Sequence, residues 1–238
     1  MSDHFTSSDE DLEEVLNLLE VPKNVNYFEE IVPQFTNEQF STHFRVSRHV
    51  SQHLAQRFGA SEYYHQEGDS VKVTPLKCIL VFLWFAGNEA VSYRDVADRF
   101  GISQSTLFKI IRRVINFLSN LSSEVIVWPT DDEKNEIEAW FRNKNFVGVI
   151  GAIDGTHIKI DKPAEDPDSY LNRKHFFSVQ AQVVCDHKRR IRDIFVGYPG
   201  SVHDARVFRT SPLCTSLPNK CGDLYILGDS AYPASNIY

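Results

Sequence analysis

The chain has 238 residues, of which 42% are hydrophobic and 24% are charged. This composition excludes intrinsically disordered and fibrous proteins and fits one large domain or two small ones. The formal net charge is −7, but residues 1–22 hold seven of the 32 acids and no Lys or Arg, so the remaining 25 acids balance the 25 bases. The negative sum therefore does not exclude a nucleic-acid partner, because local basic patches decide such binding.

The spacing of the cysteines and the hydropathy of the chain exclude further classes of protein. The four cysteines are scattered and form no C-x-x-C pair, which disfavours a zinc knuckle and a disulfide framework. The longest apolar stretch, residues 78–87, is far shorter than the ~20 residues of a membrane helix. The N-terminus is acidic and lacks the apolar core of a signal peptide. We therefore expect an intracellular protein with no membrane span.

The N-terminal half of the chain carries helical signals. We expect an acidic, mobile tail over residues 1–39 and a helical domain over residues 40–128. Thr74-Pro75 should begin an apolar helix, because Thr caps helices well and Pro is tolerated in the first turn. The helices expected from such signals are 40–58 (ended by Gly59), 74–87, 92–118 (two helices broken at Gly101) and 130–142 (begun by a T-x-x-E capping box).

The pattern changes to strands after residue 145. Two apolar β-favouring runs separated by DHKRR predict a hairpin. A helical half followed by a strand-rich half indicates an α+β protein, with a second domain over residues 130–238. The expected strands are 146–153, 156–160, 178–185, 191–198 and 224–228, with a short helix at 203–210.

Residues 92–118 have the pattern of a helix-turn-helix. Gly101 supplies the turn, where a positive φ costs glycine little, and Ser103 can cap the second helix. The small side chain of Ala97 lets the two helices touch. The alternative is a helical hairpin that only packs, but the polar and basic outer face of the second helix favours insertion into a DNA major groove. The residues expected to contact DNA are Gln104, Ser105, Lys109, Arg112 and Arg113.

Three aspartates, Asp154, Asp204 and Asp229, lie at or just after predicted strands. Carboxylates gathered at adjacent strand ends can share Mg²⁺ or Mn²⁺, and two such ions can clamp the attacking and leaving oxygens of a phosphodiester. Each aspartate also has a structural alternative. Asp154 with Gly155 is a common hairpin-turn dipeptide, Asp204 could cap a helix, and Asp229 could begin a loop. Their joint occurrence beside a helix-turn-helix favours the metal site.

Other polar residues near these aspartates carry weaker signals. His157 and His203 could line the site, but we assign a ligand role to neither, because a His on a half-buried strand is more often structural. A basic cluster at the proposed hairpin tip favours a solvated turn over a phosphate contact or a nuclear-import patch. This cluster consists of Lys188, Arg189, Arg190 and Arg192.

Taken together, these segments resemble PIF/Harbinger transposases and the host nuclease derived from them. The resemblance covers roughly residues 75–238, in the family's order. It implies an RNase H-like catalytic domain whose acidic triad binds divalent cations for cutting and joining DNA strands. The matching segments are SYRDVADRFGISQSTLFKIIRRV, GVIGAIDGTHIKI, FSVQAQVVCD, IRDIFVGYPGSVHDARVFRTSPL and YILGDSAYP.

The resemblance also implies roles for the aspartates. Asp154 matches the first catalytic acid, at the end of the first strand, and Asp229 matches the acid at the end of the fourth. Asp204 matches another acid that the family places at the metal site, so which of Asp204 and Asp229 is the second catalytic aspartate stays open. The family's final acid is a glutamate on a downstream helix. It has no counterpart before Tyr238, so we expect an incomplete catalytic domain.

Two functions follow from these expectations. The first is a DNA endonuclease that depends on Mg²⁺ or Mn²⁺, and the second is a non-catalytic helix-turn-helix protein that binds DNA. The resemblance further implies a nuclear location and a Myb/SANT-like partner protein.

Overall fold

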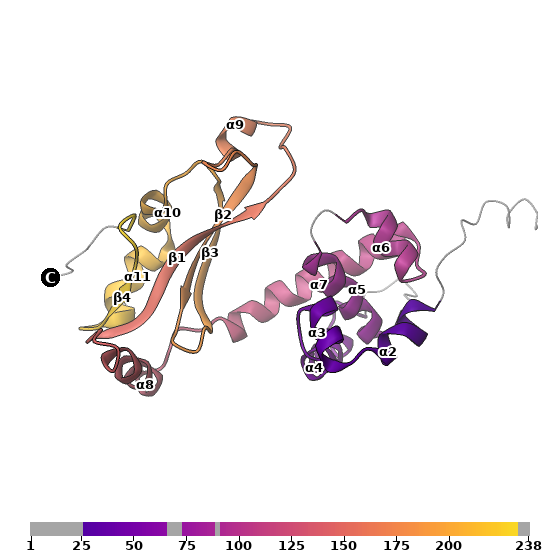
Figure 1. Ribbon diagram of the computed structural model, residues 1–238, viewed down its shortest axis with the longest axis horizontal. Coiled ribbons are helices and arrows are strands. Elements are labelled where there is room, and N and C mark those ends of the chain that lie inside the picture. Colours follow the sequence, from indigo (N-terminus) through magenta and orange to yellow (C-terminus); the bar gives the residue numbers. More distant parts are fainter. Residues whose placement is uncertain (1–25, 66–72, 89–90, 233–238) are drawn as a thin grey trace, which may run out of the picture. The chain divides into compact units, whose positions relative to one another are not determined.

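The computed structural model describes residues 26–65, 73–88 and 91–232 (Figure 1). The chain divides into two compact units, Met1–Leu121 and Ser122–Tyr238. In the described residues the first unit is helical, and the second carries a four-stranded mixed sheet with helices. This architecture confirms the predicted α+β class and is consistent with part of an RNase H-like domain.

The cap predicted at Thr74 determines where helix α5 of the first unit begins. The Oγ1 atom of Thr74 accepts a hydrogen bond from the backbone N–H of Lys77 at 3.3 Å, so the apolar helix α5 begins at Pro75 as expected. Among the described residues, no helix is both long and apolar enough to cross a membrane. The elements are η1 (Tyr27–Ile31), α2 (Val32–Gln34), α3 (Asn37–Phe44), α4 (Arg48–Gly59), α5 (Pro75–Gly87), α6 (Tyr93–Arg99) and α7 (Gln104–Val125).

The single helix predicted over residues 40–58 is in fact two helices. Arg45 adopts a left-handed conformation (φ 62°) that ends α3, and Ser47 caps α4 by accepting a hydrogen bond from the backbone of Val50 at 3.3 Å. The apolar periodicity continues through both helices, so the hydrophobic pattern alone does not show the break. Gly59 ends α4 as predicted.

The C-terminal part of the predicted tail is folded. The prediction for residues 1–25 lies outside the described residues, but residues 26–39 form η1, α2 and the start of α3. Tyr27 and Val32 are buried in the core of the first unit, and the Tyr27 ring packs edge to face on Phe100, with 5.3 Å between centroids. Aromatic burial of this kind holds the segment in the fold.

The second unit begins before the predicted position 130, at Ser122. Its sheet has the strand order β3-β2-β1-β4, in which β1 and β4 are parallel and the other neighbouring pairs are antiparallel. The predicted hairpin is confirmed as β2 and β3. The elements are α8 (Asp131–Arg142), β1 (Val149–Lys159), α9 (Pro167–Tyr170), β2 (Ser178–Cys185), β3 (Ile191–Pro199), α10 (Asp204–Thr210), α11 (Pro212–Cys221) and β4 (Tyr225–Leu227).

Strand β1 corrects one prediction about the site. The sequence predicts two strands separated at Asp154-Gly155, but β1 is continuous and pairs with β2 from Ala152 to Lys159. Asp154 lies opposite Val183, so it is inside the strand and not at its end. The hairpin-turn alternative for Asp154-Gly155 is therefore wrong, because the antiparallel ladder runs straight through the dipeptide.

The core of the second unit lies between the sheet and its helices. Ile150 and Ile153 of β1 pack with Ile137 of α8, Phe208 of α10 and Leu213 of α11. All five side chains are at most 6% exposed. Complete burial of an aliphatic side chain of this size contributes about 1.5–3 kcal/mol. This packing fixes α10, and with it Asp204, against the strand that carries Asp154.

Candidate functional site

Asp204 lies against β1 through a close approach that only glycine permits. It is the first residue of α10, while the preceding His203 caps the helix by accepting a hydrogen bond at Nδ1 from the backbone of Ala205 at 3.3 Å. The helix-cap alternative for Asp204 is therefore wrong. A Cβ atom on Gly155 would lie 3.1 Å from Cγ of Asp204 and would overlap Oδ1. The absence of a side chain at Gly155 thus places the Asp204 carboxyl group beside the residue that follows Asp154.

Asp154 lies within β1, and Asp229 follows the neighbouring strand β4. In the parallel pair of β1 and β4, Ala152 lies opposite Leu227, the last residue of β4. Asp154 is two residues after Ala152 in β1, whereas Asp229 lies two residues beyond the end of β4, as the loop alternative for Asp229 predicted. Both aspartates are exposed. Asp154 Oδ1 accepts a hydrogen bond from the following backbone N–H at 2.7 Å, and Asp229 Oδ1 accepts one from Ala231 at 2.9 Å. These local bonds leave the second oxygen of each carboxylate for another partner.

A tyrosine that the sequence reasoning missed lies among the three aspartates. The Tyr232 ring packs edge to face on Phe208 at 5.9 Å, and its buried hydroxyl has no hydrogen-bond partner among the described residues. Burial and the negative charges of Asp204, Asp154 and Asp229 all raise the pKa of Tyr232. All three carboxylates therefore act on one phenol. The only sequence sign was a tyrosine three residues after Asp229.

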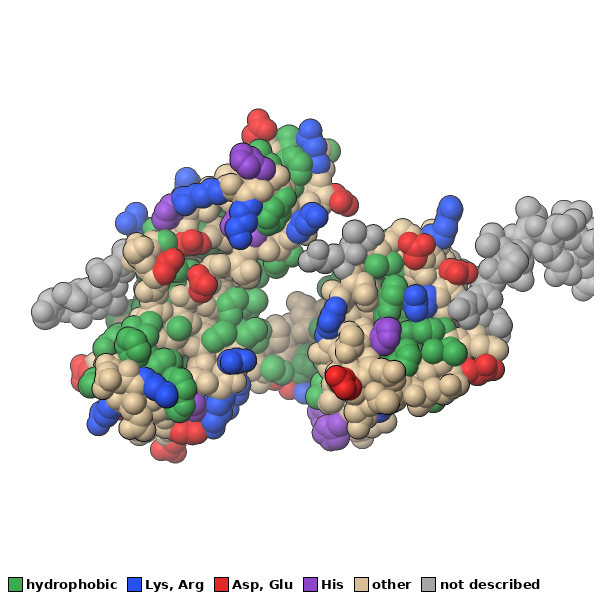
Figure 2. All heavy atoms as spheres, viewed as in Figure 1, with side chains coloured by type: hydrophobic (Ala, Val, Ile, Leu, Met, Phe, Trp, Pro, Cys, Tyr) green, Lys and Arg blue, Asp and Glu red, His purple; other side chains and the backbone are tan. Residues whose placement is uncertain are grey.

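The donor chemistry of this cluster fits a hard divalent cation. Carboxylate oxygens are the ligands that Mg²⁺ and Mn²⁺ prefer. Figure 2 shows acidic side chains gathering on the surface near α10 and β1. Nevertheless, within the described part of the chain, no three His, Cys, Asp or Glu residues are grouped in a way that could hold a metal ion. The fold brings the aspartates into one neighbourhood without assembling a ligand shell.

The two histidines of the region make structural contacts. The Nδ1 atom of His157 lies 3.1 Å from Oγ of Ser178, which also accepts a hydrogen bond from Nδ2 of Asn172 at 2.9 Å. His203 caps α10. The prediction gave neither histidine a ligand role, and these contacts supply each with a structural one.

The basic cluster of the β2–β3 hairpin is largely paired with acids. Arg192 donates to Glu133 of α8 at 2.7 Å and to Asp186 at 2.9 Å, and Arg190 also donates to Asp186 at 2.7 Å. The Asp186 side chain is fully buried. Burial by itself would raise the pKa of Asp186, but the hydrogen bonds from Arg190, Arg192 and the backbone of Lys188 lower it. The prediction of a solvated turn thus holds for Lys188, Arg189 and Arg190, which are exposed, and is wrong only for the buried Arg192, whose ion pair with Glu133 ties the hairpin to α8.

Helices α6 and α7 form a tight pair around Gly101. Gly101 has φ 62°, and Ser103 caps α7 by accepting a hydrogen bond from the backbone of Thr106 at 3.1 Å, both as predicted. The inner faces of the two helices are buried, with every member of the predicted stripe at most 4% exposed. These residues are Val96, Ala97, Phe100, Leu107, Ile110, Ile111 and Val114.

The outer face of α7 differs from the prediction at one position. Arg113 is only 6% exposed and cannot face a DNA groove, because it lies three residues after Ile110 and four before Phe117, on the buried stripe. Its charge acts on Cys78: burial raises the pKa of this thiol to about 12, against the lowering effect of Arg113. The other predicted DNA contacts are exposed, namely Gln104, Ser105, Lys109 and Arg112.

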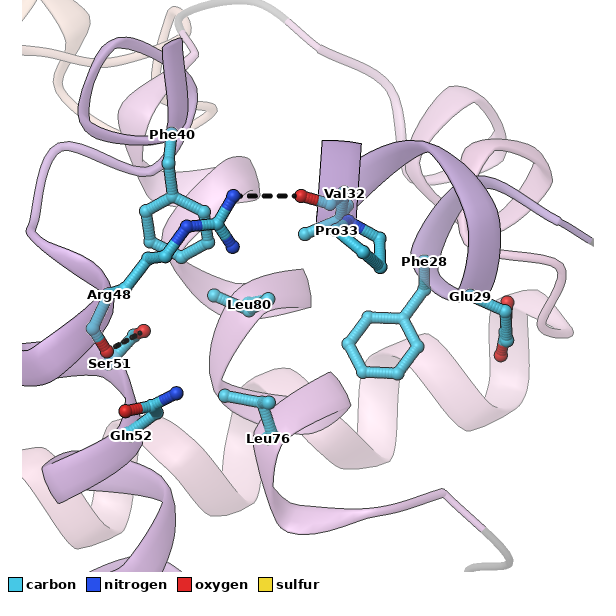
Figure 3. A pocket seen from close by; sticks show the side chains of 10 residues that line it. All are labelled: Phe28, Glu29, Val32, Pro33, Phe40, Arg48, Ser51, Gln52, Leu76 and Leu80. Carbon is cyan, nitrogen blue, oxygen red and sulfur yellow. Dashed lines mark hydrogen bonds between the residues drawn. The ribbon is translucent and has the colours of Figure 1, made fainter. Parts of the chain in front are cut away.

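The helical unit also contains a cavity of about 250 Å³ between η1, α2, α3, α4 and α5. Figure 3 shows the Arg48 guanidinium lying over the Phe40 ring, 4.4 Å from its centroid, and donating to the carbonyl of Val32. Arg48 donates to the carbonyl of Phe35 as well, at 2.5 Å. Most other lining side chains are apolar, so the cavity has the character of helix packing and not of a reactive centre.

Comparison with known proteins shows what the second unit is similar to. Residues 153–238 match the family described as DDE superfamily endonuclease. Endonucleases of this superfamily generally use divalent metals.

The relatives of the chain point to the Harbinger branch of this superfamily. The chain is 29% identical over 203 residues to "Putative nuclease HARBI1" of Rattus norvegicus. The aligned region covers 83% of the chain and 57% of that protein. It is 31% identical over 119 residues to "Protein ALP1-like" of Arabidopsis thaliana, or 49% of the chain and 29% of that protein. The chain thus spans little more than half the length of its HARBI1 relatives. These matches confirm the resemblance, while no solved structure matches the chain significantly.

Proposed function

We propose that the chain is a transposase-derived DNA endonuclease that depends on Mg²⁺ or Mn²⁺. Asp154, Asp204 and Asp229 are its metal ligands and catalytic acids in this proposal. The observation that carries it is the convergence of the three carboxylates: Asp204 lies against Gly155, the residue after Asp154, and Asp229 follows β4, the parallel neighbour of the strand that carries Asp154. The endonuclease family match over the same residues supports the assignment.

The residues of the chain would prepare the site in two ways. In the exposed carboxylates of Asp154 and Asp229, Oδ1 accepts a local backbone hydrogen bond and Oδ2 stays available, so small side-chain rotations could direct both groups toward one cation. Three negative charges in one neighbourhood repel each other unless a cation is present, which favours cation binding. A bound divalent ion would polarise the phosphodiester and activate the attacking water.

The helix pair α6–α7 supplies the proposed DNA contact. In this proposal the pair is a helix-turn-helix, supported by the short turn at Gly101 between α6 and α7, and the exposed face of α7 is the recognition surface. Arg112 and Lys109 would neutralise phosphates, and Gln104 at the start of the helix could contact base edges. Arg113 has no part in this surface because it is buried. The nuclear location and the Myb/SANT-like partner stay predictions.

A plasmid-nicking assay tests the enzymatic function. The parent should convert supercoiled plasmid to nicked or linear DNA when Mg²⁺ or Mn²⁺ is added, and chelation should stop the reaction. Asp154→Asn should abolish cutting while DNA binding persists. Asp161→Asn is the matched control, because Asp161 is an exposed aspartate just beyond the end of β1. Equal cutting by the Asp154→Asn variant would exclude the proposed site.

A second function is favoured by a specific observation. Within the described residues no metal-holding group is assembled, which suits a protein that binds DNA through α7 without cutting it. In that case Arg112→Ala would weaken DNA binding, and no cation would produce cutting. Metal-dependent nicking that disappears in Asp154→Asn would rule this second function out.

A further inference from the structure

Strand β2 carries a row of buried polar side chains that the proposed function does not yet explain. Ser178, Gln180 and Gln182 are 0%, 3% and 2% exposed. Alternate residues of a strand point to the same face, and the next residue of this row, Val184, belongs to the apolar core. Burying an amide side chain costs free energy unless its polar atoms form hydrogen bonds. Buried glutamines on this face of β2 therefore indicate a role other than core packing.

One member of this row contacts the site directly. The Nε2 atom of Gln180 donates a hydrogen bond to Oδ1 of Asp204. The Oε1 atom of Gln180 and both amide atoms of Gln182 are buried without a hydrogen-bond partner among the described residues. The contact with Asp204 is thus the only side-chain hydrogen bond found there for either glutamine.

Gly155 makes room for this contact. It lies opposite Gln182 in the pairing of β1 and β2. A Cβ atom on Gly155 would approach Nε2 of Gln180 to 3.2 Å and Cγ of Asp204 to 3.1 Å. The amide and the carboxylate therefore meet in a space that the glycine leaves open, next to Asp154.

We propose that Gln180 is a positioning residue of the metal site, which fixes the Asp204 carboxylate through Oδ1 and leaves Oδ2 for the cation. A neutral amide suits this task, because it orients the carboxylate without supplying a positive charge that would compete with a metal ion. The inference rests on the proposed function, since it concerns the same site.

The test is the affinity of the full chain for Mn²⁺, measured from the electron paramagnetic resonance signal of free Mn²⁺. Gln180→Met removes the donor at nearly constant volume, and Gln182→Met makes the same change one step along the buried row. Loss of hydrogen bonds to metal ligands typically weakens metal binding 10–100-fold. Gln180→Met should therefore raise the dissociation constant about tenfold, and Gln182→Met should change it by less than about twofold.

Each outcome of the Mn²⁺ titration either supports or overturns the positioning role of Gln180. Mn²⁺ binding that is weakened in Gln180→Met but not in Gln182→Met supports the inference. Binding that is unchanged in Gln180→Met, or weakened equally in both variants, overturns it and leaves the proposed function standing. A parent that binds no Mn²⁺ overturns the proposed function and the inference together. If Gln180→Met does not fold, Gln180→Asn, which withdraws the amide by one carbon, must show the same weakening.

Discussion

The substitution Gly155→Ala tests the packing at the centre of the site. The added Cβ would overlap Oδ1 of Asp204 and lie 3.1 Å from Cγ, so Asp204 must move. Overpacking of this kind costs about 1–3 kcal/mol. Gly155 has no positive φ, so alanine fits the strand backbone and regains about 0.4–1 kcal/mol by restricting the unfolded chain. The difference between these two ranges is a net loss of about 0–2.6 kcal/mol, or up to roughly 15 °C in the Tm of the second unit.

A double-mutant cycle separates this clash from other effects. Asp204→Ala removes the carboxyl group that the new Cβ would meet. In that background Gly155→Ala should be neutral or slightly stabilising, because the carboxyl atoms nearest the new Cβ are gone and the next atom, Nε2 of Gln180, ends a flexible side chain. Urea unfolding of the four proteins, followed by circular dichroism, gives the coupling free energy. Additive effects of the two substitutions would refute the proposed contact between Gly155 and Asp204.

Three further predictions follow from other contacts. The folded-state pKa of Asp186 is lowered, so its contribution to stability is present above the unfolded-state pKa and is lost as pH falls through the folded-state value. Thermal unfolding should therefore show stability decreasing below about pH 4, less steeply in Asp186→Asn, and parallel curves would contradict this. Arg112→Ala should weaken DNA binding and reduce its salt dependence without changing Tm, because Arg112 is exposed. Arg113→Ala should instead lower Tm, because Arg113 is buried. The reverse pattern in DNA-binding titrations and thermal melts would exclude our assignment of the two faces of α7. Since burial raises the pKa of Cys78 to about 12, mass spectrometry should find this thiol unmodified by alkylating reagents at pH 8 until the protein unfolds, and rapid modification of the native protein would disprove its burial.

Much of the fold could be predicted because local chemistry determines it. The Thr130 capping box is formed as predicted, with Oγ1 accepting from the backbone of Glu133 at 3.3 Å and Oε2 of Glu133 accepting from the backbone of Thr130 at 3.1 Å. The β2–β3 hairpin followed from two apolar runs with a polar segment between them. These signals act over a few residues, so a single sequence contains them.

The errors arose where tertiary contacts override local preference. Asp154-Gly155 favours a turn by itself, but pairing with β2 keeps it extended and reserves Gly155 for the approach of Asp204. Arg113 looked like a groove-facing base because of its charge, although its position on the helix belongs to the buried stripe. An arginine can bury its aliphatic stem, so charge alone was a poor guide.

The candidate site could be outlined from the sequence only in part. Asp154, Asp204 and Asp229 could be proposed as its acids, since each follows or adjoins an apolar run, and their catalytic role stays a prediction. Gln180 and Tyr232 could not be named, because their roles depend on residues distant in the chain. Gln180 contacts Asp204 from another element, and Tyr232 is identified only by three charges converging on it.

The central claim is that the three aspartates bind a divalent cation, and a Mn²⁺ titration of the thermal midpoint tests it most directly. A ligand at 100 times its dissociation constant stabilises the folded state by about 2.7 kcal/mol. We predict a rising Tm for the parent and for the Asp161→Asn control, and no rise for Asp154→Asn. A Tm that does not respond to Mn²⁺ in the folded parent, or that rises equally in Asp154→Asn, would contradict the metal site.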